Sequence, residues 1–380
     1  MPKTKKTIAI NTRFLLPNKL EGIGHFTCES LRRITQQHPE HDFIFLFDRP
    51  YSAHYIFANN IRPVVVSPQA RHPILWYLWF EWAIPRHLST IRPDIFVSTD
   101  GYGSLRSNTP SLVVLHDLAF EHYPEQVPFM VRKYYQYYSP KFAQKASRIA
   151  TVSEYTKQDI CDKYGISPSK IDVVHNGAND IYAPLSSDEK QQIKAQYTQG
   201  SDYFLFVGAI HPRKNLANIL RAYEQLKQQG NCSAKFVVAG RKAWQSSEAF
   251  TVYEQMQFKS EVIFLGHLQL SVLAKIYAAA TALVYASLFE GFGIPIIEAM
   301  RSEVPVITAN TSSMPEVAGD AALLVSPDSV AQISTAMQQL YEQPALRQQL
   351  IGKGKVQYQK FGWQQTADKL WASIERVLYL

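Results

Sequence analysis

The chain has 380 residues, a length that favours two domains over one. Apolar residues make up 46% and charged residues 19% of the chain, which excludes an intrinsically disordered protein. The net charge is +7, and residues 1–180 hold 21 Lys and Arg against 16 Asp and Glu, so most of the surplus lies in the first half.

Short apolar strands alternate with amphipathic helices along this first half, a pattern typical of α/β layers built on a parallel sheet. The main predicted helices lie at 24–37, 74–87, 129–145 and 154–164. The predicted strands lie at 7–12, 42–47, 63–66, 94–98, 111–115, 148–152 and 171–174. We therefore expect a doubly wound, Rossmann-like domain over residues 1–183.

Two glycines, Gly22 and Gly24, stand where the first predicted helix begins. Glycines at such a place let the backbone approach a ligand closely, although a pair of this kind also occurs in ordinary turns. The third glycine of a dinucleotide-binding fingerprint is missing, so we do not expect an NAD site here.

The predicted strand 111–115 runs directly into His116 and Asp117. Ligands of parallel sheets bind at the carboxyl ends of the strands, so an imidazole at this place could bond a sugar hydroxyl. The other interpretation is a histidine that is satisfied by Asp117 or by the backbone.

Two aromatic segments in this half allow several interpretations. Residues 75–82 (LWYLWFEW) are apolar around most of a helix, which indicates a buried core helix. Residues 132–138 (RKYYQYY) interleave cations with tyrosines and could stack acceptor sugars, lie at a membrane interface or contact nucleic acid. Nucleic acid as a partner is favoured only by the positive charge and the tyrosines, and no nucleic-acid-binding motif supports it. We therefore do not expect nucleic acid as a partner.

A polar stretch at 184–200 is the predicted linker, and it is expected to be partly helical. A second α/β series follows and predicts another Rossmann-like domain over residues 201–362. Its predicted helices are 216–229 and 271–280, with further helices starting at 295 and near 329. Its predicted strands are 203–207, 235–239, 262–265, 282–286, 305–308 and 321–325.

The first strand of the second series leads through Gly208 to Arg213 and Lys214, and a helix follows with Asn215 as its predicted N-cap. Cations at a helix N-terminus on the carboxyl side of a strand can clamp a diphosphate. The alternative is a loop whose charges are simply solvated.

The segment FEGFGIPIIEAM carries two carboxylates, Glu290 and Glu298, on either side of two glycines and a proline. It lies between an apolar strand and a helix that starts near Pro295, where backbone N–H groups can bind an anion. We expect Glu298 in the first helical turn, where it could accept hydrogen bonds from ribose or sugar hydroxyls. The alternative, a tight turn with a dipole-compensating glutamate, leaves Glu290 unexplained.

With seven residues between its two glutamates, this segment resembles the E-x7-E signature of the retaining family-4 glycosyltransferases. The resemblance extends over nearly the whole chain and is strongest to bacterial mannosyltransferase-like members that build polysaccharide or O-antigen. It implies the GT-B fold, in which an N-terminal acceptor domain and a C-terminal donor domain face each other across a cleft. It also implies that the last helix, 363–380, packs back on the N-terminal domain.

The same resemblance assigns roles to the candidate residues. His116 and Glu290 are expected at the reacting sugar, with Glu298 on the ribose. Many members of the family carry an arginine immediately after the glycine of the phosphate loop, but this chain has Ala209 there. We therefore expect Arg213 to be the arginine that binds phosphate. The expected donor-binding residues are Gly22, Gly24, Arg213, Lys214, Gly291, Phe292, Gly293 and Glu298.

The expected reaction moves a hexose from a nucleotide-diphosphate sugar to a glycan or lipid-linked acceptor. Mannose is the first candidate for the hexose, with GDP-mannose as the donor. No Asp-x-Asp occurs in the chain, so we expect neither a metal clamp nor a cofactor. Rival hypotheses are a sugar-nucleotide epimerase, a phosphorylase-like enzyme and a non-catalytic nucleotide-sugar binding protein.

Three widely separated cysteines and the lack of a signal-like or membrane-spanning apolar run predict a cytoplasmic protein. The basic first half could add peripheral contact with an anionic membrane face, or be an ordinary surplus of charge.

Overall fold

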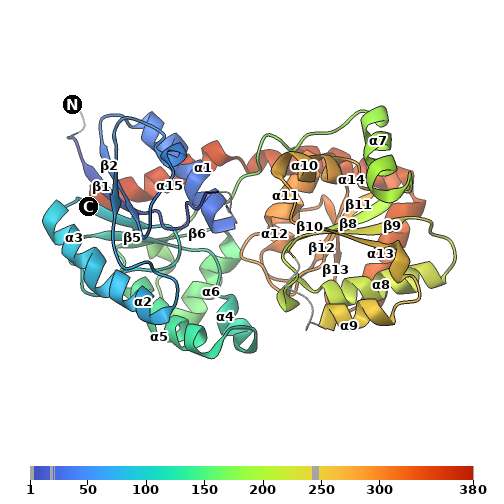
Figure 1. Cartoon of the computed structure of the whole chain (residues 1–380), viewed down its shortest axis with the longest axis horizontal. Helices are drawn as coiled ribbons and strands as arrows, with labels where there is room; N and C mark the ends of the chain where they lie inside the picture. Colours follow the sequence, from blue (N-terminus) through green and yellow to red (C-terminus); the bar gives the residue numbers. More distant parts are fainter. Residues whose placement is uncertain (1–3, 18–19, 21, 242–247, 380) are drawn as a thin grey trace. The chain divides into compact units, whose positions relative to one another are not determined.

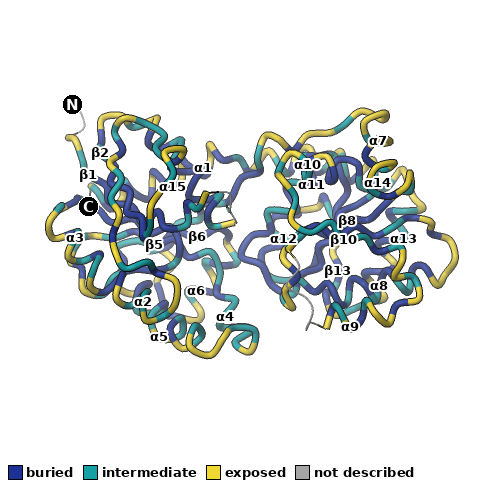
Figure 2. The backbone as a smooth tube through the Cα atoms, in the orientation of Figure 1, coloured by how far each residue is buried: buried dark blue, intermediate teal, exposed yellow. Residues whose placement is uncertain are grey.

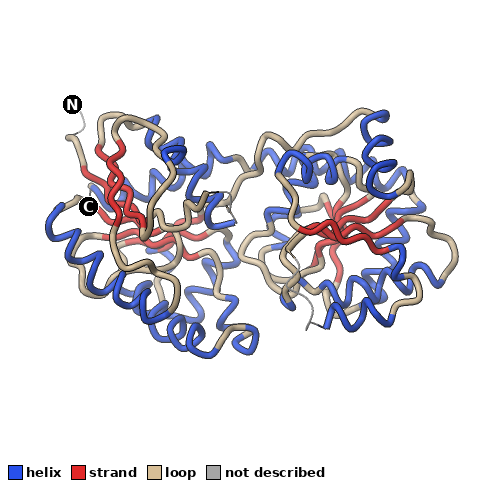
Figure 3. The backbone as a smooth tube through the Cα atoms, in the orientation of Figure 1, coloured by secondary structure: helices blue, strands red, loops and turns tan. Residues whose placement is uncertain are grey.

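The structure is a computed structural model that describes residues 4–17, 20, 22–241 and 248–379. The chain divides into two compact units, Met1–Gly177 together with Trp363–Leu380, and Ala178–Gly362. Each unit is an α/β structure whose strands lie in the middle and are flanked by helices (Figure 1, Figure 3).

The first unit is built on a seven-stranded parallel sheet with the order β3-β2-β1-β4-β5-β6-β7. All seven predicted strands are present, because strands buried on both faces appear in the sequence as nearly continuous apolar runs. The order reverses between β1 and β4, which makes this pair the topological switch point of the sheet. The strands are β1 Thr7–Asn11, β2 Asp42–Phe47, β3 Ile61–Val65, β4 Ile95–Ser98, β5 Ser111–Leu115, β6 Arg148–Thr151 and β7 Ile171–Val173.

The helices of this unit include the last one in the chain, α15, which packs against α1. There Trp371 stacks on His38 with ring centroids 3.8 Å apart. The helices are α1 Gly22–Gln37, α2 Pro73–Leu78, α3 Ile84–Ile91, α4 Ala119–His122, α5 Phe129–Lys145, α6 Glu154–Tyr164 and α15 Trp363–Leu378, with short 3-10 turns at Ala53–Tyr55, Pro124–Gln126 and Pro168–Lys170.

The expected single helix at 74–87 is divided by a π-helical turn, η2, at Trp79–Ala83. In this turn the N–H of Ile84 donates to the carbonyl oxygen of Trp79, five residues back. Pro85 follows at the start of α3 and has no N–H to continue the regular pattern, which explains why the register changes here.

The second unit is built on a six-stranded parallel sheet with the order β10-β9-β8-β11-β12-β13, and all six predicted strands are present. Its switch point lies between β8 and β11. The strands are β8 Tyr203–Val207, β9 Lys235–Ala239, β10 Val262–Gly266, β11 Ala282–Tyr285, β12 Val306–Ala309 and β13 Ala322–Val325.

The stretch expected as a linker, 184–200, contains a capped helix, α7, which belongs to the second unit and contacts α10. The Ser186 side chain accepts from the N–H of Glu189, whose carboxylate accepts from the N–H of Ser186 in return. The helices of this unit are α7 Ser187–Thr198, α8 Leu216–Gln228, α9 Glu248–Gln255, α10 Leu270–Ala278, α11 Ile294–Arg301, α12 Met314–Ala318, α13 Val330–Glu342 and α14 Pro344–Gln357, with 3-10 turns at Pro212–Lys214, Lys259–Glu261 and Tyr358–Lys360.

The cores lie between the sheets and their covering helices, and the central strands of both sheets are buried (Figure 2). In the second unit Ile219, Leu220 and Tyr223 of α8 are fully buried against the sheet. Their helical spacing is the reason why this helix could be predicted from its sequence pattern.

Candidate functional site

The clearest functional cluster lies at the switch point of the second sheet. The turn Pro212–Lys214 follows β8, and the loop that contains Glu290 follows the neighbouring strand β11. Both segments therefore leave the sheet at its carboxyl edge, the place where doubly wound sheets bind ligands.

At the centre of this cluster is the carboxylate of Glu290, whose side chain is only 8% exposed. The Lys214 Nζ lies 2.7 Å from one carboxylate oxygen, and the Arg213 Nη1 lies 3.1 Å from the other. Lys214 also donates to the Tyr285 hydroxyl at 2.7 Å. Two cations therefore share one carboxylate, which leaves a surplus of positive charge at the edge of the sheet.

The protonation state of Glu290 follows from these contacts. Burial alone would raise the pKa of its carboxyl, but the opposing charges of Lys214 and Arg213 outweigh burial and lower this pKa to about 2. Glu290 is therefore ionised at neutral pH, so it carries no proton that it could donate to a leaving group.

Two serines of the segment between β12 and α12 hold the Glu290 loop in place. The Glu290 N–H donates to the Ser312 Oγ at 3.0 Å. The Ser313 hydroxyl lies within hydrogen-bonding distance of the carbonyl oxygens of Glu290 and Phe292, at 2.9 and 3.0 Å. Neither serine could be placed at the site from the sequence, because no spacing rule links residues 312–313 to residue 290.

Asn215 is the N-cap of α8, as predicted, but its side chain forms no cap hydrogen bond. A side-chain cap goes with an extended backbone, whereas Asn215 is left-handed, with φ 59° and ψ 29°. Its amide instead donates to the carbonyl oxygens of Ala286 at 2.9 Å and Pro327 at 2.7 Å. Asn215 thus connects the Arg213–Lys214 turn to the end of β11.

The carboxyl ends of β8 and β9 approach each other closely at two glycines. A Cβ at Gly240 would lie 1.8 Å from the carbonyl oxygen of Gly208, so only glycine fits there. The N–H of Gly240 donates to the carbonyl oxygen of Gly266 at 2.8 Å, which extends the contact to the end of β10. The backbones of three neighbouring strand ends therefore lie in direct contact at this edge.

The backbone of Gly291, Phe292 and Gly293 leads into α11, as expected for a segment that offers N–H groups to an anion. Gly293 is the N-cap, with a φ of +99° that favours glycine. The Phe292 ring is buried and meets the Phe361 ring edge to face, with centroids 5.4 Å apart. This packing fixes the direction in which the loop enters the helix.

The partners of the Glu298 carboxylate are tyrosine hydroxyls. The expectation that it lies in the first turn of the helix is wrong, because α11 starts at Ile294 and Glu298 belongs to the second turn. Its carboxylate accepts a hydrogen bond from the Tyr277 hydroxyl at 2.9 Å. Burial raises the pKa of Glu298 to about 7, against the hydroxyls of Tyr277 and Tyr182, which lower it.

In the first unit, His116 is oriented by the backbone. Its Nε2 lies 2.8 Å from the Thr99 carbonyl oxygen, and since a carbonyl only accepts, Nε2 carries the proton. Burial lowers the pKa of His116, against the hydrogen bond to Thr99 and the charge of Asp117. The imidazole is thus neutral, with Nδ1 as its acceptor, and the Phe26 ring of α1 lies edge-on at 5.0 Å.

The two glycines at the start of α1 differ in what surrounds them. A Cβ at Gly24 would meet the carbonyl oxygen of Phe14 at 2.9 Å, whereas one at Gly22 would meet nothing within 4 Å. Close packing therefore requires a glycine at position 24 only. The neighbouring Lys19 and Glu21, which belong to the same glycine loop, lie outside the described residues.

A second polar cluster, which the sequence did not reveal, lies at the switch point of the first sheet. The guanidinium of Arg13 pairs with Asp100 at 2.5 Å, and both side chains are buried. The Asn11 amide donates to Ser98 and Asp100, at 3.0 and 2.9 Å. The available signal was that β1 and β4 both end in polar residues although they are buried strands.

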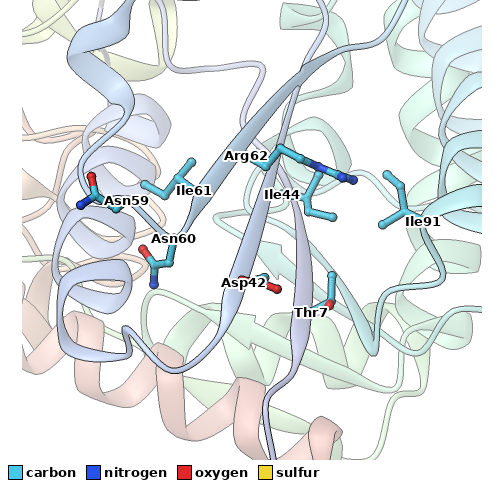
Figure 4. Close-up of a pocket in the computed structure, with 8 residues that line it drawn as sticks. All are labelled: Thr7, Asp42, Ile44, Asn59, Asn60, Ile61, Arg62 and Ile91. Atoms are coloured by element: carbon cyan, nitrogen blue, oxygen red, sulfur yellow. The ribbon is translucent and has the colours of Figure 1, made fainter.

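A cavity of about 340 Å³ opens at the other edge of the first sheet (Figure 4). Thr7, Asp42 and Ile61, which line it, stand at the amino ends of β1, β2 and β3. Ligands of parallel sheets bind at the opposite, carboxyl edge, so we assign no catalytic role to this cavity.

Among the residues that the structure describes, no group of three or more His, Cys, Asp and Glu has an arrangement that could hold a metal ion. Within the same residues, no helix combines the length and the apolar character needed to cross a membrane.

The chain matches two protein families. Residues 187–357 match the family described as "Glycosyl transferases group 1", and residues 21–180 match "Glycosyltransferase Family 4". The chain is 30% identical over 288 residues to the O-antigen chain mannosyltransferase RfbU of Salmonella typhimurium, covering 74% of this chain and 76% of that one. It is 29% identical over 255 residues to the O-antigen chain mannosyltransferase B of Escherichia coli, covering 67% of each chain.

Solved structures with the same fold have much lower identity. Anabaena Alr3699/HepE, solved in complex with UDP and glucose, superposes with a TM-score of 0.75 at 14% identity and covers 98% of this chain and 99% of its own. WaaG, a glycosyltransferase involved in lipopolysaccharide biosynthesis, gives 0.72 at 15% identity, over 96% and 98%. The two parallel-sheet units together therefore have the GT-B fold. On the family matches and the identity to these mannosyltransferases, the chain belongs to the family-4, group 1 glycosyltransferases.

Proposed function

We propose that this glycosyltransferase is a retaining hexosyltransferase that moves mannose from GDP-mannose to a glycan or lipid-linked acceptor during polysaccharide synthesis. The observation that carries the proposal is the pairing of Lys214 and Arg213 with Glu290 at the switch point of the second sheet. The names of the related O-antigen mannosyltransferases support the choice of sugar and of pathway.

The two cations would act on the departing nucleotide diphosphate. Negative charge grows on that group as the bond to the sugar breaks, and preorganised donors stabilise it most at that moment. Lys214 and Arg213 are already held in place by Glu290, so little reorganisation is needed when a diphosphate arrives. The N–H groups of the Gly291–Gly293 backbone would add further donors at the start of α11.

Glu290 would act on the sugar as a carboxylate. With a pKa of about 2 it is a weak base and holds no proton at neutral pH, so its role is electrostatic. It would accept hydrogen bonds from sugar hydroxyls or stabilise positive character at the anomeric carbon. This role agrees with retention, in which no residue has to activate the acceptor hydroxyl on the face of the sugar opposite the leaving group.

Glu298 would hold the ribose, because a carboxylate offers about four acceptor sites and can accept from a ribose hydroxyl in addition to Tyr277 and Tyr182. In the first unit, His116 would offer Nδ1 as an acceptor to a hydroxyl of the donor sugar.

Leaving-group stabilisation by cations and backbone N–H groups requires no metal, so a metal-free reaction is part of the proposal. A lipid-linked acceptor would bring the enzyme to a membrane, so the proposal includes peripheral contact with an anionic membrane face.

A thermal-shift screen over GDP-, UDP- and ADP-sugars tests the donor, because a ligand that binds the native state raises the unfolding temperature. We expect GDP-mannose to give the largest shift, and NMR of the glycoside formed should show the α configuration of the donor retained. A larger shift with a UDP- or ADP-sugar would overturn the assignment of GDP-mannose as the donor. A β-glycoside as the product would overturn the assignment of a retaining mechanism.

The same mixtures separate the rival functions. A non-catalytic binding protein would bind the donor and transfer nothing to any acceptor. A sugar-nucleotide epimerase would convert the nucleotide sugar to its epimer without an acceptor, and a phosphorylase-like enzyme would require inorganic phosphate.

A further inference from the structure

A buried ion pair at the switch point of the first sheet has no part in the proposed reaction. Arg13 and Asp100 each stand two residues beyond the end of a strand, β1 and β4, and their side chains are 5% and 1% exposed. Removing two charges from water is costly, and a buried pair often adds little to net stability. The pair therefore calls for another explanation, at the edge of the sheet where ligands bind.

The Asp100 carboxylate is the centre of a polar network that connects the ends of β1 and β4. One of its oxygens accepts from the Asn11 amide at 2.9 Å and from the Ser98 hydroxyl at 3.1 Å. The other oxygen accepts from the Arg13 Nε at 2.5 Å. The backbone N–H of Arg13 donates in turn to the Asn11 Oδ1 at 3.3 Å, which closes the network.

The residue that this network surrounds is Thr99. Its neighbours in the chain, Ser98 and Asp100, are bonded to each other, so the backbone is held on both sides of it. Its hydroxyl lies 2.8 Å from the Thr27 hydroxyl of α1 and 3.3 Å from the carbonyl oxygen of Asn11. The peptide group of Thr99 therefore has a fixed direction.

The Thr99 carbonyl oxygen is the partner of His116, whose Nε2 lies 2.8 Å away. A carbonyl can only accept, so its position determines which ring nitrogen carries the proton and how the ring is oriented. The side chains of Asn11, Arg13 and Asp100 are buried, whereas His116 is partly exposed. The network can therefore act on a ligand only through His116.

We propose that Asp100 and Arg13 are positioning residues, which fix the orientation and the tautomer of His116 through the Thr99 carbonyl oxygen. This inference rests on the proposed contact between the His116 Nδ1 and the donor sugar. If the carbonyl turned away, the proton could move to Nδ1, which would then no longer accept from a sugar hydroxyl. Misplacement of a contacting group by about 1 Å can cost about 100-fold in rate.

Two variants remove the ion pair. Asp100→Asn places an NH2 group against one of the donors that the carboxylate accepts from, and Arg13→Gln with Asp100→Asn leaves no unpaired charge in the interior. The ¹⁵N NMR spectrum of the full chain reports the tautomer of His116, whose signals are those that His116→Gln removes. We expect the Nε2-protonated form in the wild type and a mixture of tautomers in both variants. Turnover of the donor selected by the thermal-shift screen should fall at least about tenfold in kcat/KM.

Two threonines of α1 provide a milder, matched pair. Thr27 and Thr35 are both fully buried, and each hydroxyl lies within hydrogen-bonding distance of a carbonyl oxygen one turn earlier in the helix, at 2.9 and 2.8 Å. Only Thr27 also contacts Thr99. Thr27→Val should therefore lower kcat/KM about threefold and mix the tautomers of His116, and Thr35→Val should change neither.

The measurements separate this inference from the proposed contact with the sugar. A wild-type rate in His116→Gln would refute the contact, while the NMR spectra would still report whether the network positions the ring. A lower rate in His116→Gln, with an unchanged tautomer in the Asp100 and Thr27 variants, would overturn the positioning role. A lower unfolding temperature without a change of tautomer would likewise assign the ion pair to stability alone.

Discussion

Two carboxylates that look equivalent in the sequence are chemically different in the folded protein. Glu290 is paired with two cations and has a pKa of about 2, whereas Glu298 meets tyrosine hydroxyls and has a pKa of about 7. Environments that push two pKa values apart give their groups separate roles. At neutral pH Glu290 is a permanent anion, and Glu298 changes its charge within the physiological range.

Lys214→Ala tests the cation pair. The substitution leaves Arg213 as the remaining cation beside Glu290, so it removes half of the proposed diphosphate clamp. We expect kcat/KM to fall by at least about tenfold, the effect of roughly 1.4 kcal/mol of lost transition-state stabilisation. Lys190→Ala, on α7, serves as the control. A variant with the wild-type rate would remove Lys214 from the phosphate site.

Tyr277→Phe tests the hydrogen bond to Glu298. The Tyr277 hydroxyl lowers the pKa of Glu298, so its removal should raise that pKa further above 7. If the ionised carboxylate binds the ribose, the affinity for GDP rises with pH in the wild type, and in the variant this rise moves to higher pH. Calorimetric titration between about pH 5.5 and 8.5 measures the shift on either side of the neutral range.

Glu298→Gln provides the control for that experiment, since it has no carboxyl group to titrate. Its GDP affinity should lack the pH-dependent step that belongs to Glu298, while any step that belongs to GDP itself remains. Identical pH profiles in the wild type and Tyr277→Phe would show that Tyr277 does not position the carboxylate.

At the scale of elements, strands were easier to predict than the connections that form the site. Buried parallel strands are continuous apolar runs, and all thirteen predicted strands are present. The clustering of Lys214 and Arg213 with Glu290 could only be anticipated from the family motif, because the two segments are joined by pairing of β8 with β11. Local propensity correctly predicted Asn215 as the N-cap of α8, but tertiary contacts determine the direction of its side chain.

Gly240→Ala tests the close approach of β8 and β9. Since the added Cβ would lie 1.8 Å from the Gly208 carbonyl oxygen, the strand ends must move apart. We expect a loss of about 2 kcal/mol or more in unfolding free energy, measured by urea denaturation, together with weaker donor binding.

Gly352→Ala is the matched substitution. Gly352 lies inside α14, and a Cβ there would meet nothing within 4 Å. Alanine in a helix interior should stabilise the protein by about 0.5–1 kcal/mol. If both substitutions had the same effect, the predicted clash at Gly240 would be wrong.

At the scale of the whole molecule, the chain builds its first unit from both ends. Residues 178–362 form the second unit without interruption, and α15 then returns to pack against α1 in the first. A truncation after Gly362 should therefore leave the second unit folded and destabilise the first. Hydrogen exchange should show lost protection in β1 to β7 and retained protection in β8 to β13. Loss of protection in the second sheet instead would contradict this division.

The position of α15 also determines the order of events while the chain is being synthesised. The second unit is complete once residue 362 has emerged from the ribosome, whereas the first still lacks the helix that covers α1. Vectorial synthesis usually lets the N-terminal part of a protein fold first. Here the N-terminal sheet must wait, partly uncovered, until residues 363–378 are translated, so chaperones have longer access to the unit whose synthesis begins first.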